Sequence, residues 1–223
     1  MLPRYETKLR DIRTSISSLL SSIIVASKES LRGFEENRIE LYESARDHLK
    51  TLQTDANAID NEIIKTFALF GPEAQELRLL VAYLKMTNDL DRIGDATRKY
   101  AKRLEEHCKS ECDLSVITNT IVQLHKTALN ALQYIHECLI ADDACDADEL
   151  YRKVMVEESK NDDLFSILEK DLLNLIITSG ELSVEYVKVL GTIRKLERTC
   201  DRAVNIAALL LFAQNGGQMH MYN

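Results

Sequence analysis

One segment occurs twice in this chain, and the repetition restricts the possible folds more than any other feature. Residues 81–104 align with residues 187–210 at a constant offset of 106. The identical positions are Val81/Val187, Leu84/Leu190, Leu90/Leu196, Arg92/Arg198, Asp95/Asp201, Ala101/Ala207 and Leu104/Leu210. Chance would give roughly two matches in such a window. We therefore interpret the chain as an internal duplication.

Each copy belongs to a long helical segment. Seven glycines and two prolines leave few breaks in 223 residues, and the apolar residues recur at helical rather than strand spacing. Helices are predicted over residues 5–32, 39–70 and 72–107, then from a point after residue 113 to about 140, and over 148–179 and 182–214. Short links make consecutive helices antiparallel neighbours. The predicted fold is all-α, with six long antiparallel helices in two tandem three-helix bundles, residues 1–110 and 111–215, followed by a flexible tail, 216–223.

Both copies carry an acid four residues before an aspartate, Asp91 with Asp95 and Glu197 with Asp201. Residues four apart lie on one face of a helix, so the two carboxylates of each pair are neighbours. Like charges so placed repel unless a proton or a cation lies between them. The repeated pairs therefore suggest metal ligands, and the alternative is solvated charge paired with nearby arginines.

These motifs resemble those of the PhoU family of phosphate-uptake regulators. The resemblance lies in Leu-Asp-Arg-Ile-Gly-Asp at 90–95, Leu-Glu-Arg-Thr-Cys-Asp at 196–201 and Pro-Glu-Ala-Gln-Glu-Leu-Arg at 72–78, and it covers nearly the whole chain. It implies two pseudo-symmetric bundles lying side by side, with metal clusters held on the bundle surface. Oxygen ligands favour hard or borderline cations, and Fe, Mn or Mg is expected.

Further acids could complete the two sites. Glu158 and Asp162 on the fifth helix are also four apart and could face Glu197 and Asp201. The first half has Asp55 and Asp60 in the corresponding region, but their spacing is five, which puts the symmetry of the two sites in question. Gly94 lies inside a predicted helix, which suggests close approach of a backbone or an ion.

Composition excludes several functions. The net charge of -8 argues against a nucleic-acid binder, whose surface would be basic. No apolar run of about 18 residues and no secretory signal pattern is present, so a cytoplasmic protein is expected. The five cysteines form an odd set without a dense framework, which predicts reduced thiols and no structural disulfide.

The expected function is that of a regulator rather than an enzyme. No phosphate-binding glycine loop, nucleophile elbow or Cys/His arrangement for covalent catalysis is present. The resemblance implies control of phosphate uptake and phosphate-starvation signalling through contacts with a phosphate ABC transporter ATPase subunit and a sensor histidine kinase, at the membrane only through such partners. A homodimer is a further possibility. The alternatives are a metal-dependent helical-bundle enzyme, and a metal-free adaptor or accessory protein of a simpler phosphate carrier.

Overall fold

The computed structural model describes residues 3–141 and 144–217, and every regular element in these ranges is helical. The all-α prediction is therefore confirmed. The part of the predicted tail at 218–223 lies outside the described residues. The elements are α1 (Pro3–Glu35), α2 (Glu40–Asp47), α3 (Leu52–Phe70), α4 (Ala74–Cys108), α5 (Thr118–Ala141), α6 (Ala147–Thr178), a short 3₁₀ turn η2 (Gly180–Leu182) and α7 (Ser183–Asn215).

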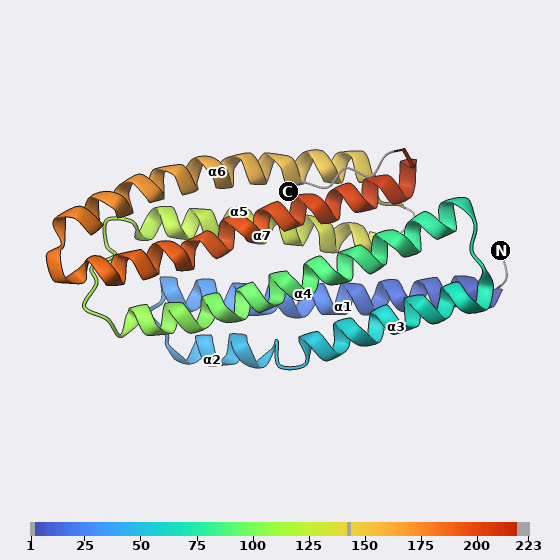
Figure 1. Ribbon diagram of the computed structural model, residues 1–223, viewed down its shortest axis with the longest axis horizontal. Coiled ribbons are helices and arrows are strands. Elements are labelled where there is room, and N and C mark those ends of the chain that lie inside the picture. Colours follow the sequence, from blue (N-terminus) through green and yellow to red (C-terminus); the bar gives the residue numbers. More distant parts are fainter. Residues whose placement is uncertain (1–2, 142–143, 218–223) are drawn as a thin grey trace.

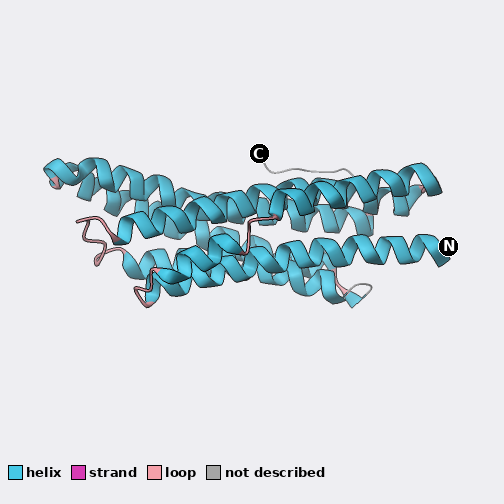
Figure 2. Cartoon of the chain, turned by 90° about the horizontal axis from the view of Figure 1, so that it is seen from below, coloured by secondary structure: helices cyan, strands magenta, loops and turns pink. Residues whose placement is uncertain are grey.

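The helices form two bundles that lie side by side along their length (Figure 1). The first bundle contains α1, the pair α2–α3, and α4, whereas the second contains α5, α6 and α7. Helix α4 packs along α7 and α1 packs against α5, so one helix pair from each copy of the repeat joins the halves. Figure 2 shows the same elongated arrangement from below. The predicted pair of three-helix bundles is confirmed.

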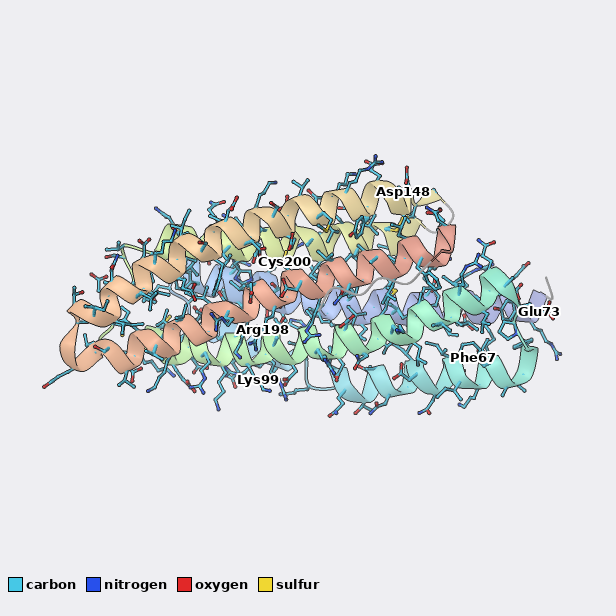
Figure 3. The ribbon with its side chains drawn as sticks, turned by 45° about the horizontal axis from the view of Figure 1, so that its top comes forward. Phe67, Glu73, Lys99, Asp148, Arg198 and Cys200 are labelled. Carbon is cyan, nitrogen blue, oxygen red and sulfur yellow. A yellow bond between two sulfur atoms is a disulfide. The ribbon has the colours of Figure 1, made fainter. Side chains whose placement is uncertain are left out.

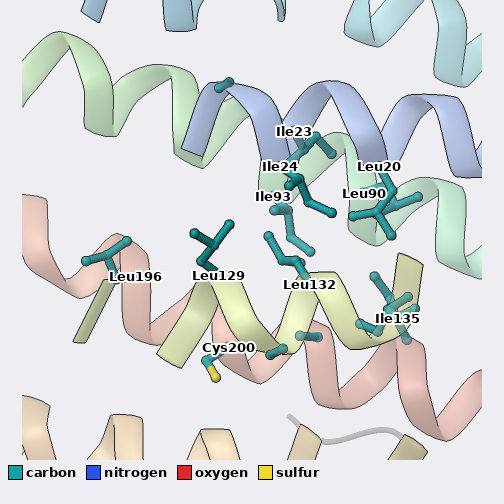
Figure 4. Packing of buried hydrophobic residues seen from close by; sticks show 14 of the residues in the cluster. Leu20, Ile23, Ile24, Leu90, Ile93, Leu129, Leu132, Ile135, Leu196 and Cys200 are labelled. Carbon is teal, nitrogen blue, oxygen red and sulfur yellow. The ribbon is translucent and has the colours of Figure 1, made fainter. Parts of the chain in front are cut away.

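A single apolar core runs through both bundles. Ile23 of α1, Leu90 and Ile93 of α4, Leu132 of α5 and Leu196 of α7 are all buried in one cluster (Figure 4). These long helices therefore bury apolar residues against the other half as well as within their own. The predicted boundary between residues 110 and 111 falls in the link after α4, and the independence of the two units stays a prediction.

The second predicted helix is interrupted, which corrects its expected continuity over 39–70. Helix α2 ends at Asp47 and α3 begins at Leu52. Within the link, the amide of Lys50 donates to the carbonyl of Asp47, three residues before, which is the tighter 3₁₀ pattern. Leu49 within the link and Leu52 at the start of α3 are both buried, so the break turns both side chains into the core. The link contains no glycine or proline that would have indicated this break.

A disulfide between Cys138 and Cys145 contradicts the prediction of reduced thiols throughout. The turn from α5 into α6 reverses the chain and brings these residues, seven apart in sequence, to a Cα–Cα distance of 5.0 Å, within the range that a disulfide requires. The prediction weighed the number and spacing of the cysteines and could not include this proximity. Cys108, Cys112 and Cys200 are free, as expected.

The group that approaches Gly94 most closely is a side chain, that of Leu52, where the sequence had suggested a backbone or an ion. A Cβ atom built at this position would lie 2.4 Å from Cδ2 of Leu52, the first residue of α3. Leu52 is itself buried and 6% exposed, so it has little room to withdraw. The glycine therefore allows α3 and α4 to approach closely at the segment of α4 that carries Asp91 and Asp95.

We expect Gly94→Ala to destabilise the protein by about 1–2 kcal/mol, because overpacking against Leu52 outweighs the better helix propensity of alanine. Gly191→Ala is the matched control, since Gly191 is helical and exposed and an added Cβ meets nothing within 4 Å. The control should gain up to about 1 kcal/mol. Urea unfolding of both variants measures the difference. Equal effects of the two substitutions would contradict this account of Gly94.

Candidate metal centre

Helices α6 and α7 bring three acids of the second half together. Carboxylate oxygens of Glu158, Asp162 and Asp201 all lie within 4.8 Å of one another. Glu158 and Asp162 are one turn apart on α6, and Asp201 reaches them from α7, which packs antiparallel to α6 (Figure 1). Among the described residues this is the only group of three or more potential ligands so close together. The sequence suggested that Glu158 and Asp162 could face Glu197 and Asp201, and the structure brings three of these four acids together.

The fourth acid, Glu197, belongs to the same electrostatic group. Burial and the neighbouring Asp201 raise the pKa of Glu197. Burial, together with Asp162, raises the pKa of Asp201, and burial with Asp162 and Asp201 raises that of Glu158. The Oε2 atom of Glu197 is buried and has no hydrogen-bond partner. The cations Arg194, Arg198 and Arg202 oppose these shifts only in part, so negative charge remains concentrated here.

This donor set fits a hard or borderline cation. Four carboxylates offer oxygen ligands only, which suits Mg²⁺, Mn²⁺ or Fe²⁺ rather than thiolate-preferring ions. A divalent ion would offset the repulsion between these carboxylates, and the Oε2 atom of Glu197, which has no hydrogen-bond partner, could be one of its ligands. Cys200, one residue before Asp201, is fully buried and packs in the core on the α6 side of α7 (Figures 3 and 4). Burial raises the pKa of the Cys200 thiol, which suits a packing role.

One buried acid of this region did not attract attention in the sequence. Glu157 is 5% exposed, and its carboxylate accepts hydrogen bonds from Lys160, at 2.8 Å, and from Asn130 on α5, at 3.3 Å. These partners satisfy the charge of Glu157, in contrast to Glu197. Only the position of residue 157 on the buried face of α6 could have indicated this burial. Because Glu157 and Glu158 are adjacent acids, the sequence did not show which of them faces the core.

The first acidic pair lies in different surroundings. Asp95 forms two ion pairs: its Oδ2 atom lies 2.6 Å from Nζ of Lys99, and its Oδ1 atom lies 2.9 Å from Nη2 of Arg98. Although burial raises the pKa of Asp95, these two cations outweigh it and hold the pKa below its usual value. The position equivalent to Lys99 in the second half is Asn205, which carries no charge. The protein therefore neutralises Asp95 with its own side chains, whereas Asp201 forms no ion pair among the described residues.

The first half also lacks the acids that α6 supplies to the second. At the offset of 106, Glu158 and Asp162 correspond to Leu52 and Ala56, both buried and apolar. Asp60 is near Asp91, since burial and then the Asp91 charge raise the pKa of Asp60, and its Oδ1 atom is buried without a hydrogen-bond partner. Asp55 is exposed and accepts from Thr51, away from the pair. The symmetry of the two sites, questioned from the spacing, is indeed broken.

A basic groove replaces the acidic centre at this place. A cavity of about 580 Å³ opens between α4, α7 and the link before α3, and Asp91 and Asp95 lie in its wall. Its other charged lining residues are all cations: Lys50, Arg92, Arg98, Lys99, Lys195, Arg198 and Arg202. Burial and the charges of Lys99 and Arg198 lower the pKa of Lys195. Sequence reasoning treated the arginines only as partners of the acids, although Arg92/Arg198 is one of the repeated identities.

Comparisons with known proteins agree with this fold. A family model described as "PhoU domain" matches residues 16–104 and again residues 121–210. The chain is 29% identical to a phosphate-specific transport system accessory protein PhoU homolog of Xylella fastidiosa, over 96% of this chain and 88% of that protein. The PhoU protein of Escherichia coli is 22% identical, covering 96% and 86%.

Solved structures show the same architecture. The crystal structure of PhoU from Pseudomonas aeruginosa superposes with a TM-score of 0.86, at 22% sequence identity, covering 96% of this chain and all of that one. The phosphate transport system regulatory protein PhoU from Streptococcus pneumoniae gives 0.76 at 20% identity, covering 98% and 99%. Among the described residues, no helix is long and apolar enough to cross a membrane.

Proposed function

The chain belongs to the PhoU family, and from that premise we propose that it is a metal-binding regulator of phosphate uptake and phosphate-starvation signalling. Its relatives are named as accessory proteins of a phosphate-specific transport system. We propose that this chain acts in the cytoplasm through protein contacts, with the ATPase subunit of a phosphate ABC transporter and a sensor histidine kinase as partners. The accessory names of the relatives also support a regulator in place of an enzyme.

The convergence of Glu158, Asp162 and Asp201 within 4.8 Å is the observation that carries the metal-binding part of the proposal. Glu197 adds a buried oxygen without a partner. Three carboxylates so close together repel one another at neutral pH, and a divalent cation relieves that repulsion. We propose that this second-half centre binds the tighter metal ion. Asp91 and Asp95 remain predicted ligands, with weaker binding because Lys99 and Arg98 already neutralise Asp95.

Metal content measured by plasma mass spectrometry, on protein without a histidine tag, tests the proposal. After incubation with Mg²⁺, Mn²⁺ or Fe²⁺ and removal of free ions, we expect at least one equivalent in the parent and almost none in Glu158→Gln/Asp201→Asn. Asp91→Asn/Asp95→Asn should retain most of the metal. Glu43→Gln/Asp47→Asn is the matched control, because these two exposed acids are also four apart on one helix but have no third acid beside them among the described residues.

The stability of the metal-free protein separates loss of ligands from loss of fold. A carboxyl whose folded pKa is raised stabilises the protein below its unfolded pKa and loses that stabilisation as the pH rises through the folded pKa. The raised pKa of Glu197 and Asp201 therefore means that their charges destabilise the metal-free fold at neutral pH. Glu197→Gln and Asp201→Asn should unfold at the same or a higher temperature than the metal-free parent. If the parent protein still contains no metal after incubation with Mg²⁺, Mn²⁺ or Fe²⁺, the proposed metal site is wrong.

The partner contacts need a separate test. Purified transporter ATPase subunit and sensor kinase, immobilised in turn, should bind the metal-loaded parent. The Glu158→Gln/Asp201→Asn variant should bind more weakly if the metal orders the contact surface. Binding to neither partner would favour the accessory protein of a simpler phosphate carrier, whereas turnover of a phosphate ester with added metal would favour an enzyme.

A further inference from the structure

The basic groove beside Asp91 concentrates positive charge on an acidic protein. The whole chain has a net charge of -8, yet the charged lining of the groove is seven cations and two acids. The cations come from three separate parts of the chain: the link before α3, helix α4 and helix α7. A helix face that merely carries solvated charge would not need residues this far apart in sequence to line one cavity. The convergence of like charges on one hollow suggests an anionic occupant.

Four of these cations already have acidic partners. Arg98 and Lys99 bind Asp95, Lys50 lies 2.8 Å from Asp47, and Arg202 lies 3.1 Å from Asp89. Once these acids and Asp91 are counted, the groove still holds three excess positive charges. Three cations of the groove form no ion pair in the described part of the chain: Arg92 of α4, and Lys195 and Arg198 of α7. Arg198 also lies close enough to Glu197 and Asp201 to lower the pKa of both carboxyls.

The two exposed arginines come from equivalent positions of the repeat. Arg92 and Arg198 are identical at the offset of 106 and extend into the groove from α4 and α7, which pack together. Figure 3 shows Arg198 between these two helices, with Lys99 nearby on α4. Lys195 lies one turn before Arg198 and is half-buried. Guanidinium groups bind phosphate oxygens in bidentate fashion, and an ammonium group adds a compact charge.

We propose that this groove binds a small inorganic anion with two or more linked phosphoryl groups, pyrophosphate or a short polyphosphate. A terminal phosphoryl group carries about 1.5 negative charges at pH 7, so the two groups of pyrophosphate carry about three and balance the three excess charges. The cavity volume of about 580 Å³ is within the range of small-ligand sites. Among the described residues, no aromatic side chain lines the groove to stack on a base, which favours an inorganic oligophosphate over a nucleotide. The metal centre on the α6 side of α7 is not needed for this binding.

Isothermal titration calorimetry of the full chain with tripolyphosphate, pyrophosphate, orthophosphate and sulfate tests the proposal. The protein is stripped of metal and exchanged into chelator-free buffer, so that the outcome is independent of the metal centre. We expect tripolyphosphate and pyrophosphate to bind at one per chain, and orthophosphate and sulfate at least about tenfold more weakly, since each lost charge-assisted contact weakens binding by about that factor.

The variant Arg92→Gln/Lys195→Gln/Arg198→Gln should weaken tripolyphosphate binding by about 100-fold or more. Its matched control is Arg10→Gln/Lys28→Gln/Arg152→Gln, which removes the same charges from exposed positions outside the groove. The control should stay within about twofold of the parent. Circular dichroism and thermal unfolding establish that both variants are folded.

Several results would overturn the proposal. One is no heat of binding for either oligophosphate at millimolar concentration. Another is equal weakening in the groove variant and in the control, which would show non-specific attraction to surface charge. A third is equally tight binding of sulfate or of a poly-glutamate peptide, which would assign the groove to general anions or to an acidic protein segment.

Discussion

Arg202→Met is expected to lower the free energy of unfolding of the metal-free protein by about 3 kcal/mol, because it leaves a buried carboxylate without its partner. Asp89 of α4 has a side chain only 6% exposed, and Nη1 of Arg202 on α7 lies 3.1 Å from its Oδ1 atom. Burial already raises the pKa of Asp89 even though Arg202 opposes the shift. The ion pair also spans the contact between the two halves, so its loss should weaken their association.

Arg194→Met is the matched control for this prediction. Arg194 is on the same helix and binds Glu169 at 3.0 Å, but both side chains are well exposed. Exposed pairs of this kind contribute about 0–1 kcal/mol, so the control should unfold almost like the parent. The double variant Asp89→Leu/Arg202→Met should recover most of the loss, since replacing both charges removes the unpaired carboxylate. If the two single arginine variants unfold alike in urea, the buried pair has no special role.

His125 should make the protein sensitive to mild acid. The imidazole is buried among α1, α4 and α5, with Nε2 at 2.8 Å from Oγ of Ser27 and Nδ1 at 3.3 Å from the hydroxyl of Tyr100. Burial, despite the hydrogen bond with Ser27, lowers the pKa of His125 to about 3. The folded protein thus holds this ring neutral, and the ring joins the two halves at the α1–α5 contact.

The sign of the pH dependence follows from the two pKa values. The unfolded chain protonates His125 below about pH 6.5, whereas the folded chain does not do so until much lower pH, so acid favours unfolding. The contribution of His125 is therefore complete above about pH 6.5 and decreases by about 1.4 kcal/mol per pH unit below it, or about 2.7 kcal/mol by pH 4.5. Other acids titrate in the same range, and a comparison with a variant isolates this residue.

His125→Phe, combined with Ser27→Ala so that no buried hydroxyl is left without its partner, is the comparison variant. Urea unfolding between about pH 7 and pH 4.5 should show a smaller loss of stability in this variant than in the parent, by about the amount calculated above. The variant can differ from the parent at pH 7 because its core is repacked, so the test is the slope with pH and not the absolute stability. Parallel slopes would mean that His125 is protonated in the folded protein.

The repeat has diverged into two electrostatic surfaces on one scaffold. Position 99 is lysine in the first copy where the second has Asn205, and Leu52 takes the place of Glu158. Lys99 neutralises Asp95, whereas Asp201 is left among carboxylates. The same helix geometry therefore presents an acidic centre between α6 and α7, and a basic groove where α4 meets α7. This divergence underlies both proposals, a cation between α6 and α7 and an oligophosphate between α4 and α7.

The sequence by itself determined the helical fold, the duplication and the neighbouring positions of Glu197 and Asp201. These features depend on spacings of a few residues along one helix, which the helical period converts directly into geometry. It also pointed to Glu158 and Asp162 as possible partners, because they form another pair of acids four residues apart on a neighbouring helix. The predicted end of α3 at residue 70 is also confirmed, and Gly71 follows it in a left-handed conformation.

Only the tertiary structure decided the rest. The pairing of Cys138 with Cys145, the fit of Leu52 against Gly94 and the assembly of the groove around Arg92, Lys195 and Arg198 all depend on distances between separate elements. Such distances are set by how the helices pack, at crossing angles and depths that the side chains of every neighbouring helix determine together. The spacing of residues along one helix does not determine these distances. An acidic motif repeated in the sequence can therefore lie in two opposite electrostatic surroundings.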